Sequence, residues 1–446
     1  MGNFYQMART GKNTPLKIRA KILKNKSIQK ERDFEMGKIF SNEVKQALQD
    51  IYYNERAGRG KEALALLEKA SAAGDGDASC ILARCFCGYQ YVWSGHGFPE
   101  DDNRAISLLH KSVEQGSALG VLVALRSGEL TPSVQKKMPF ANLMEAFEEV
   151  LGIAEAGDAF CQYTIANSYF WWDFLRIQNK GRDSFPNQEA YRAYLKENIS
   201  QCEDWFWKAL RGGIYFAANN LNRYYTQGDE DIIAPRPEMA KDLWKIGAEY
   251  GHPIHQSIYA DKLENAGQNE EALRWYKASA EGGQPGSWCD VGRFYMEGKG
   301  VEKDEAYAVQ CFEREIPIGN IGSYNYLGKA YFFGRGVAQD YAKAFQLLSY
   351  AYDKGSKWGV FYLGKCCFYG LGTPQDYTRA LQFLNEVNWN YWEADYLRGM
   401  IYARGLGIAP DIPKGIAYLQ KAGSHQEAKE ELLHYKKTLF GKWVRR

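Results

Sequence analysis

The apolar positions in the C-terminal half of the chain follow the spacing of helices. Leu327 and Tyr331 in the stretch SYNYLGKAYFF are four residues apart, so both side chains lie on one face of a helix. The stretch YAKAFQLLSYAYDK carries a second run of this kind. Between the two runs, Gly334 fits the left-handed end of a helix, and Asp340 fits the capping position before the next one. The pattern therefore predicts two helices joined by a short elbow.

This helix–elbow–helix pattern recurs at offsets of 36, 36 and 35 residues. Three features mark each copy: a glycine within the first helix, a pair of glycines at the elbow and an aspartate before the second helix. The in-helix glycines are Gly292, Gly328, Gly364 and Gly399; the elbow pairs are Gly298 with Gly300, Gly334 with Gly336, Gly370 with Gly372 and Gly405 with Gly407; and the aspartates are Asp304, Asp340, Asp376 and Asp411. A period between about 20 and 50 residues is typical of supersecondary units that stack side by side.

The Gly-x-Gly of the elbow has an alternative interpretation as a phosphate-binding loop. It follows a predicted helix, however, and no Gly-x-x-Gly or Gly-Lys-Ser/Thr continuation comes after it. Dinucleotide and nucleotide triphosphate loops follow a strand. We therefore interpret the glycines as a structural turn and predict no cofactor.

The repeated stretches resemble the unit of the Sel1-like repeat (SLR) family, a branch of the tetratricopeptide-like (TPR-like) helical repeats. YNYLGKAYFFGRGVAQDYAKA matches that unit nearly throughout, WCDVGRFYMEGKGVEKDEAYA and FYLGKCCFYGLGTPQDYTRA match well, and DYLRGMIYARGLGIAPDIPKG is a looser copy. Degenerate copies precede them. The resemblance implies an all-α fold, a right-handed α/α solenoid of about nine or ten antiparallel helix pairs.

Composition and repeat quality divide the chain into four segments. Residues 1–35 are strongly basic, residues 36–284 carry the degenerate repeats, and residues 285–423 carry the regular ones. Residues 424–446 are predicted to form a capping helix and a basic tail. An aromatic-rich insertion lies near residues 174–200. We expect its aromatic flanks to bury it against its neighbours, with an exposed docking patch as the alternative.

One column of positions across the repeats carries mostly basic side chains. It comes directly after the in-helix glycine and lies away from the buried Leu and Tyr of the same helix. In TPR-like superhelices the first helix of each pair lines the inner groove, so the resemblance makes this face the candidate for binding a peptide. Cations and amides there would hold backbone or carboxylate groups, and phenylalanines would supply apolar contacts, although basic residues are common at any exposed helix position. The predicted partner-binding residues are Arg84, Arg223, Arg293, Lys329, Lys365, Asn219, Asn325, Phe332, Phe361 and Phe368.

The side chains that most often bind metals or carry catalysis show no fixed arrangement. His252 and His255 are three residues apart, but no cysteine or carboxylate accompanies them at a set spacing, so we interpret them as loop histidines. Cys80, Cys85 and Cys87 fall on a predicted helix and are interpreted as core thiols. We predict no metal site and no catalytic residue.

Charge and cysteine content bear on the setting of the protein. The net charge of +2 argues against nucleic acid as the main partner, although the basic termini leave a polyanion-binding role open. Nine cysteines with irregular spacing favour free thiols in a reducing compartment, so we expect a cytoplasmic protein. No signal peptide is recognised, and no segment reaches the roughly 18 apolar residues of a transmembrane helix.

The leading hypothesis is a non-catalytic scaffold or adaptor that binds a peptide or partner protein in the concave groove of the solenoid. No small-molecule substrate is expected. Three alternatives stay open. One is a regulator that sequesters a toxin or effector, which is still an interaction protein, and the other two belong to different classes. The first is a hydrolase or β-lactam-binding protein, as in cysteine-rich relatives of this repeat family, whose regular cysteine pair is absent from this chain. The second is a protein that binds nucleic acid or an anionic membrane through its basic termini.

Overall fold

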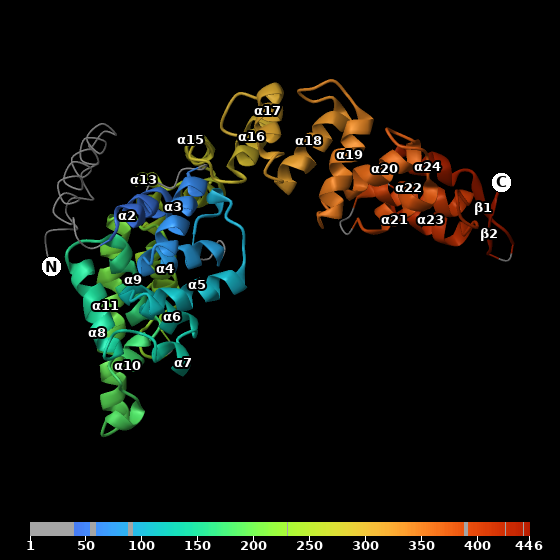
Figure 1. Cartoon of the computed structure of the whole chain (residues 1–446). Helices are drawn as coiled ribbons and strands as arrows, with labels where there is room; N and C mark the ends of the chain where they lie inside the picture. Colours follow the sequence, from blue (N-terminus) through green and yellow to red (C-terminus); the bar gives the residue numbers. More distant parts are fainter. Residues whose placement is uncertain are drawn as a thin grey trace, which may run out of the picture. The chain divides into compact units, whose positions relative to one another are not determined.

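The structure, a computed structural model, describes residues 40–53, 59–87, 92–229, 231–387, 391–423, 425–439 and 441–446. The predicted basic segment, residues 1–35, lies outside this part of the chain. The described residues fall into two compact units, an N-terminal unit that ends at Tyr250 and a C-terminal unit that begins at Gly251 (Figure 1). The predicted change in repeat quality at residue 285 is a different boundary and stays a prediction.

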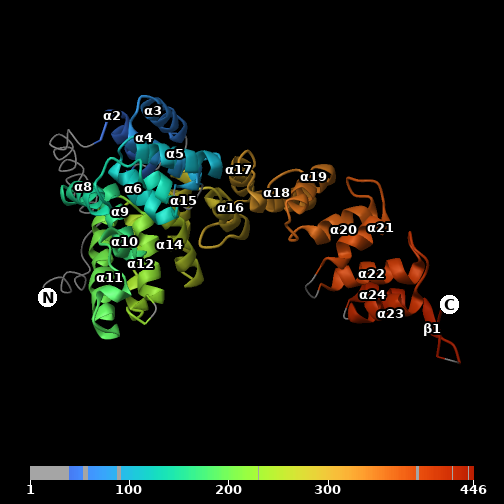
Figure 2. The same ribbon diagram turned by 60° about the horizontal axis from the view of Figure 1, so that its bottom comes forward.

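Successive helices pair with each other throughout the N-terminal unit (Figures 1 and 2). Its pairs are α2 (Asn42–Leu48), continued by the π-helix η1 (Gln49–Tyr53), with α3 (Gly60–Ala72); α4 (Gly76–Phe86) with α5 (Asp102–Glu114); α6 (Ala118–Ser127) with α8 (Leu143–Glu155); α9 (Ala159–Phe170) with α11 (Gln188–Arg211); and α12 (Phe216–Gln227) with α13 (Leu243–Glu249). The connections contain η2 (Ser94–His96), α7 (Pro132–Gln135), α10 (Asp173–Ile177), η3 (Arg182–Ser184) and η4 (Pro237–Ala240).

The C-terminal unit continues the same architecture. Its pairs are α14 (Pro253–Asn265) with α15 (Asn269–Glu281); α16 (Ser287–Glu297) with α17 (Glu305–Glu315); α18 (Ile321–Phe333) with α19 (Tyr341–Asp353); α20 (Val360–Tyr369) with α21 (Tyr377–Asn385); and α22 (Trp392–Arg404) with α23 (Ile412–Lys421). The described residues thus contain ten consecutive antiparallel pairs, which confirms the predicted helical repeat fold. The handedness of the superhelix stays a prediction.

The two glycines of each elbow have different structural roles. Gly334 ends α18 in the left-handed conformation, with a φ of 68°, and its N–H donates to the carbonyl of Ala330. Gly336 also has a positive φ, of 73°, but a Cβ atom there would lie 2.1 Å from the carbonyl oxygen of Glu305 in the preceding repeat. The second glycine therefore lets each elbow pack directly on the second helix of the previous pair. The same close approach occurs at Gly300 and Gly372.

The in-helix glycines allow the two helices of a pair to approach closely. A Cβ atom at Gly328 would lie 2.7 Å from Cγ of Leu348, and one at Gly364 would lie 2.9 Å from Cγ of Leu384. The leucines come from α19 and α21, the second helices of the same pairs. The glycine side of each first helix is therefore its buried side.

The predicted aspartate caps are confirmed. The Asp340 carboxylate accepts a hydrogen bond of 2.9 Å from the backbone N–H of Lys343 at the start of α19. A side-chain acceptor satisfies one of the free N–H groups at a helix start, which is worth about 1 kcal/mol. The same bond begins the second helix of three further pairs, at Asp304, Asp376 and Asp411.

The predicted insertion near residues 174–200 is partly helical, and its side chains from residue 179 to residue 194 are exposed or half-buried. It forms part of α10, all of η3 and the first half of α11. Phe174 and Phe206 are buried, and the indole N–H of Trp172 donates to the Asp229 carboxylate at 2.7 Å. These contacts anchor the two ends of the insertion, whereas its outer part is exposed, so the expected burial is found only at the flanks.

Residues 118–155 form a pair, α6 and α8, that the sequence pattern did not predict. This stretch has no Gly-x-Gly elbow. Its helices are joined instead through α7, which begins at Pro132 and is capped by the Thr131 hydroxyl. The pair therefore keeps the architecture of its neighbours without the marks that identify the other copies.

The C-terminal segment caps the last pair and then forms a short hairpin. Arg404 of α22 donates through Nε to the Glu431 carboxylate of α24 (Gln426–Leu432) at 2.9 Å. Strands β1 (Tyr435–Lys437) and β2 (Trp443–Arg445) then pair antiparallel, with Tyr435 opposite Arg445. The sequence predicted the capping helix but no strands in the basic tail.

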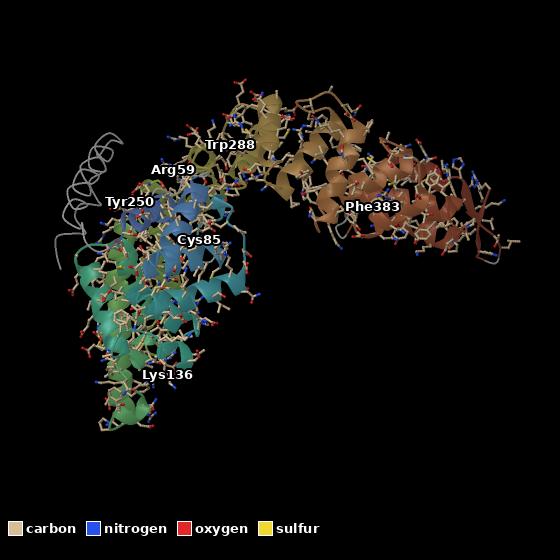
Figure 3. All side chains as sticks on the ribbon, in the orientation of Figure 1. Arg59, Cys85, Lys136, Tyr250, Trp288 and Phe383 are labelled. Atoms are coloured by element: carbon tan, nitrogen blue, oxygen red, sulfur yellow. The ribbon has the colours of Figure 1, made fainter. Side chains whose placement is uncertain are left out.

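The core of the C-terminal unit runs between the paired helices. Leu363, Leu384 and Leu397, from three successive helices, are fully buried. Phe383 packs in the same cluster and lies among the ribbons of α20 to α23 (Figure 3). This continuous apolar interior fixes the first helices of neighbouring pairs relative to one another.

Candidate functional site

The ten predicted partner-binding residues separate by accessibility. Asn219, Arg223, Arg293, Lys329 and Lys365 are exposed or half-buried. The other five are buried, so they cannot reach a partner without rearrangement. The buried residues are Arg84, Asn325, Phe332, Phe361 and Phe368.

The prediction that phenylalanines line an open groove is wrong by one helix position. It placed the rings three residues before and four residues after the in-helix glycine. That glycine faces the second helix of its own pair, so Phe332 and Phe368 point into the core with it. One residue turns a helix by about 100°, so the accessible face holds the residues directly after these.

Counting from the cation instead of the glycine identifies the accessible rings. The positions three before and four after Lys329 are Tyr326 and Phe333, and those around Lys365 are Tyr362 and Tyr369. Phe333 and Tyr369 are 46% and 48% exposed. The accessible aromatic residues could therefore have been found from the sequence, because each lies one position after a residue that was predicted to bind the partner.

We define the aromatic–lysine face as these residues of α18 and α20 together with Trp358, which directly precedes α20 and is 43% exposed. Rings from the two helices contact each other. The ring centres of Tyr326 and Trp358 are 5.2 Å apart, and those of Phe333 and Tyr362 are 5.6 Å apart. The full set is Tyr326, Lys329, Phe333, Trp358, Tyr362, Lys365 and Tyr369.

Lys329 lies among the rings of this face. Its ammonium is 5.3 Å from the ring centre of Trp358 and 5.8 Å from that of Tyr362, within the range of cation–π attraction. Burial lowers the pKa of Lys329; Arg335 lowers it further, whereas Glu297 raises it. No carboxylate among the described residues forms an ion pair with Lys329.

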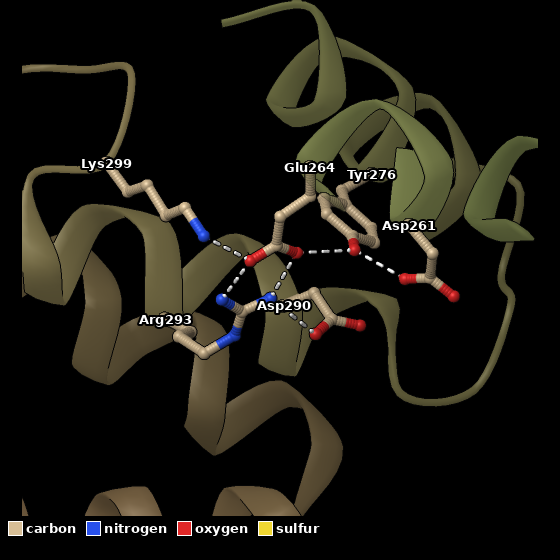
Figure 4. Close-up of polar contacts among 6 residues, drawn as sticks. All are labelled: Asp261, Glu264, Tyr276, Asp290, Arg293 and Lys299. Atoms are coloured by element: carbon tan, nitrogen blue, oxygen red, sulfur yellow. Dashed lines mark hydrogen bonds and ion pairs between the residues drawn. The ribbon is translucent and has the colours of Figure 1, made fainter. Parts of the chain in front are cut away.

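Lys365 and Arg293, the neighbouring cations of the same column, are already neutralised. Lys365 Nζ lies 2.5 Å from the Glu393 carboxylate of α22. Arg293 binds Glu264 through both terminal nitrogens, at 2.7 and 2.8 Å, and reaches Asp290 at 3.4 Å (Figure 4). These contacts leave little of either charge for a partner.

The Arg293 contacts belong to a cluster that ties α14, α15 and α16 together (Figure 4). The Tyr276 hydroxyl donates to Glu264 at 2.9 Å and also to Asp261. Hydrogen bonds from Arg293 lower the pKa of Glu264 to about 2, against the opposing effect of burial. Burial raises the pKa of Asp290 to about 6, against the opposing effect of Arg293. The cluster is a contact between two successive repeats.

Comparison with known proteins agrees with this architecture. The Sel1 repeat family model matches residues 60–75, 81–117, 267–284, 289–314, 322–356, 359–386 and 392–426. The chain is a Sel1-like repeat protein. No curated protein matches it.

Several solved structures resemble this Sel1-like repeat protein. One is c5321, a protective antigen of uropathogenic Escherichia coli strains that displays an SLR fold, with 18% identity over 82% of this chain and 89% of that one, and a TM-score of 0.41. A Sel1 repeat protein from Oxalobacter formigenes has 22% identity over 52% of this chain and 88% of that one, with a TM-score of 0.35. A chain of the APC/C heterotetramer Cut9–Hcn1 has 13% identity over 84% of this chain and 92% of that one, with a TM-score of 0.31.

In the N-terminal unit of this Sel1-like repeat protein, the predicted residues do not form one site. Arg84 is buried, and its Nε donates to the hydroxyl of Tyr52 at 3.1 Å. Arg223 is exposed and lies 4.7 Å from the ring centre of Trp171, and Asn219 precedes it by one helical turn. Cations near two rings occur here as well, at Arg84, Lys180 and Arg236, but none of the three is an exposed member of the predicted column.

A cavity of about 240 Å³ lies within the N-terminal unit, between α4, α5, α6 and α9. Its apolar lining includes Ile106, Leu109 and Leu122, and Arg84 and Arg126 line it as well. This cavity was not predictable from the sequence, because its lining comes from four separate helices.

The histidines and cysteines of this Sel1-like repeat protein are mostly buried. His252 immediately precedes α14 and His255 lies in its first turn, with their ring centres 5.7 Å apart, so the prediction of loop histidines is wrong for His255. Burial lowers the pKa of His252 to about 4. Burial raises the pKa of Cys80 to about 12, as expected for a core thiol. No group of three potential metal ligands occurs among the described residues, and none of the described helices is both long and apolar enough to cross a membrane.

Proposed function

We propose that this Sel1-like repeat protein is a non-catalytic scaffold or adaptor that binds a peptide segment or partner protein on the aromatic–lysine face. The observation that carries the proposal is the exposure of Phe333, Trp358 and Tyr369 on the first helices of two neighbouring pairs. Contiguous exposed apolar surface marks interaction sites in soluble proteins. Trp and Tyr also dominate the energetics of many interfaces, because a large ring buries much area for little conformational entropy.

The construction of the face supports the same function. Its side chains stand on α18 and at α20, whose spacing is fixed by the glycine contacts and by the core between the pairs. Sites on helices are held more precisely than sites on loops. A partner would therefore meet rings that are largely in place before binding, which lowers the entropy lost on association.

A non-enzymatic role is part of the proposal. Burial keeps the Cys80 thiol protonated at neutral pH and the His252 imidazole neutral and enclosed. A thiolate or an accessible imidazole is what nucleophilic or general-base chemistry would use. The exposed chemistry of the aromatic–lysine face is instead that of a binding surface.

A reducing, cytoplasmic setting is also proposed. All nine cysteines are unpaired, and all except Cys87 are buried. Disulfides form and persist in oxidising compartments, whereas thiols stay reduced in the cytosol. The free thiols support the second setting.

Quantitative affinity capture with the full-length chain tests the proposed function. The double variant Trp358→Ala/Tyr369→Ala is expected to capture no more than about one tenth of the partner that the unmodified chain captures. The reason is that losing one interface hot spot typically weakens the binding free energy by about 2 kcal/mol. Tyr350→Ala is the matched control, because Tyr350 is an exposed ring on the second helix of the α18–α19 pair. An identical partner set for the double variant and the unmodified chain, with all proteins equally folded by circular dichroism, contradicts the proposal.

A further inference from the structure

We infer that the aromatic–lysine face selects partner segments in which one acidic side chain lies next to an apolar one, and that Lys329 binds the acidic side chain. The inference rests on the proposed function and adds the chemistry of the partner. It follows from a difference in charge balance among three equivalent positions of the repeats.

The three cations at these positions differ in what surrounds them. Arg293 is bound on both terminal nitrogens by Glu264, and Lys365 is bound by Glu393. Lys329 occupies the middle repeat and has no carboxylate partner among the described residues. A positive charge that the protein itself does not neutralise is complementary to a negative charge on a partner.

The surroundings of Lys329 favour binding a carboxylate there. The side chain is half-buried, and burial lowers its pKa because it has lost part of its hydration. The rings of Trp358 and Tyr362 offset only part of that loss. A carboxylate from a partner would form a charge-assisted hydrogen bond in a site sheltered from water, where such bonds are strong.

The rings around Lys329 specify an apolar neighbour for that carboxylate. Trp358 lies against Tyr326, and Tyr362 lies against Phe333. Because the rings of Trp358 and Tyr362 are 5.3 and 5.8 Å from the ammonium, a residue adjacent to the bound acid lies close to an aromatic ring. A segment with an acidic residue beside an aliphatic or aromatic one satisfies both requirements.

Two carboxylates limit the acidic content of the partner. Glu297 on α16 acts on the charge of Lys329, and Glu393 on α22 neutralises Lys365. A further acidic residue would meet a like charge toward α16, and toward α22 it would meet Lys365, which is already paired with Glu393. The face therefore fits a single acidic side chain within an apolar stretch better than a run of acidic residues.

Selection from a displayed random-peptide library on the immobilised full-length chain tests the inference. The unmodified chain is expected to enrich peptides with Asp or Glu next to an aliphatic or aromatic residue. Lys329→Glu is expected to enrich Lys or Arg at that place instead. One enriched peptide is then synthesised together with its Asp→Asn or Glu→Gln form, and the affinity of each is measured by fluorescence anisotropy. The unmodified chain should bind the acidic peptide about tenfold more tightly than the neutral form. With Lys329→Met, the two peptides should bind equally.

The controls separate this inference from the proposed function. Lys354→Glu reverses an exposed lysine at the end of α19 and should leave the enrichment unchanged. If peptides enrich and Trp358→Ala weakens them, but Lys329→Met keeps the acidic preference, the inference is overturned while the scaffold role stands. If neither Trp358→Ala nor Lys329→Glu alters peptide binding, the proposed function fails as well. Thermal unfolding of each variant shows that the fold is retained.

Discussion

At the scale of single residues, neighbouring glycines of the same elbow differ in what lies opposite them. Gly334 needs a left-handed backbone and ends a helix. Gly336 needs that conformation and also lies where a Cβ atom would overlap the backbone of Glu305. Only the second requirement involves another repeat, so it cannot be recognised from one copy of the sequence.

This difference predicts unequal effects of two alanine substitutions. Gly336→Ala and Gly355→Ala both place alanine at a positive φ, but nothing lies within 4 Å of a Cβ atom at Gly355. Gly355→Ala is expected to cost about 1 kcal/mol, the strain of the left-handed backbone alone. Gly336→Ala should cost at least about 3 kcal/mol, because the elbow must also move away from α17. Urea unfolding measures the free energy of unfolding of both variants. Equal losses of stability would contradict the packing role assigned to Gly336.

The same reasoning explains how far the binding residues could be predicted. The sequence correctly indicated that the cation column lies on the first helices of the pairs. The binding face was nevertheless counted from the in-helix glycine, which faces inward, and this selected Phe332 and Phe361, which are buried. A one-position error is enough to exchange a core ring for an exposed one, because each residue turns the helix by about 100°.

At the scale of elements, the repeats are joined by specific contacts as well as by a shared apolar core. The elbow of one pair packs on the second helix of the previous pair, and the Glu264 cluster connects α14, α15 and α16. In a stack of repeats, stability is a sum of such nearest-neighbour terms. Each contact between pairs therefore contributes to the stability of a whole unit.

The Glu264 cluster predicts a pH-dependent effect of one substitution. Glu264→Gln is expected to destabilise the protein by about 2 kcal/mol at pH 7, since it leaves two half-buried cations without their carboxylate. The folded pKa of Glu264, about 2, is below its ordinary value of 4.5. Its ionised form therefore stabilises the fold fully above about pH 5 and loses that effect as the pH falls toward about 2.

Thermal unfolding at pH 7 and pH 3 checks this expectation. The difference between the unmodified chain and Glu264→Gln should be smaller at pH 3 than at pH 7. Glu270→Gln provides the control, because the Glu270–Arg274 pair is solvent-exposed and should contribute almost nothing. A difference that stays constant with pH would show that the carboxylate is not the source of the stabilisation.

At the scale of the whole molecule, ten helix pairs in two units place a small chemical site on an otherwise regular structure. The regular part was predictable, because glycines, aspartate caps and apolar spacing recur in the sequence. The α6–α8 pair and the C-terminal hairpin were not predicted, since neither carries those marks. The proposed binding role depends on departures from the repeat, and Lys329, which has no carboxylate partner among the described residues, is the clearest of them.

Photo-crosslinking in the cells that make the protein tests the binding role of this face most directly. A photoreactive phenylalanine analogue would replace Phe333 or Tyr369 on the face, or Tyr350 on α19, in the full-length chain. The account predicts that the first two positions capture the same partner protein and that the third captures none of it. Crosslinks to that partner from position 350 alone, or none from 333 and 369, would contradict it.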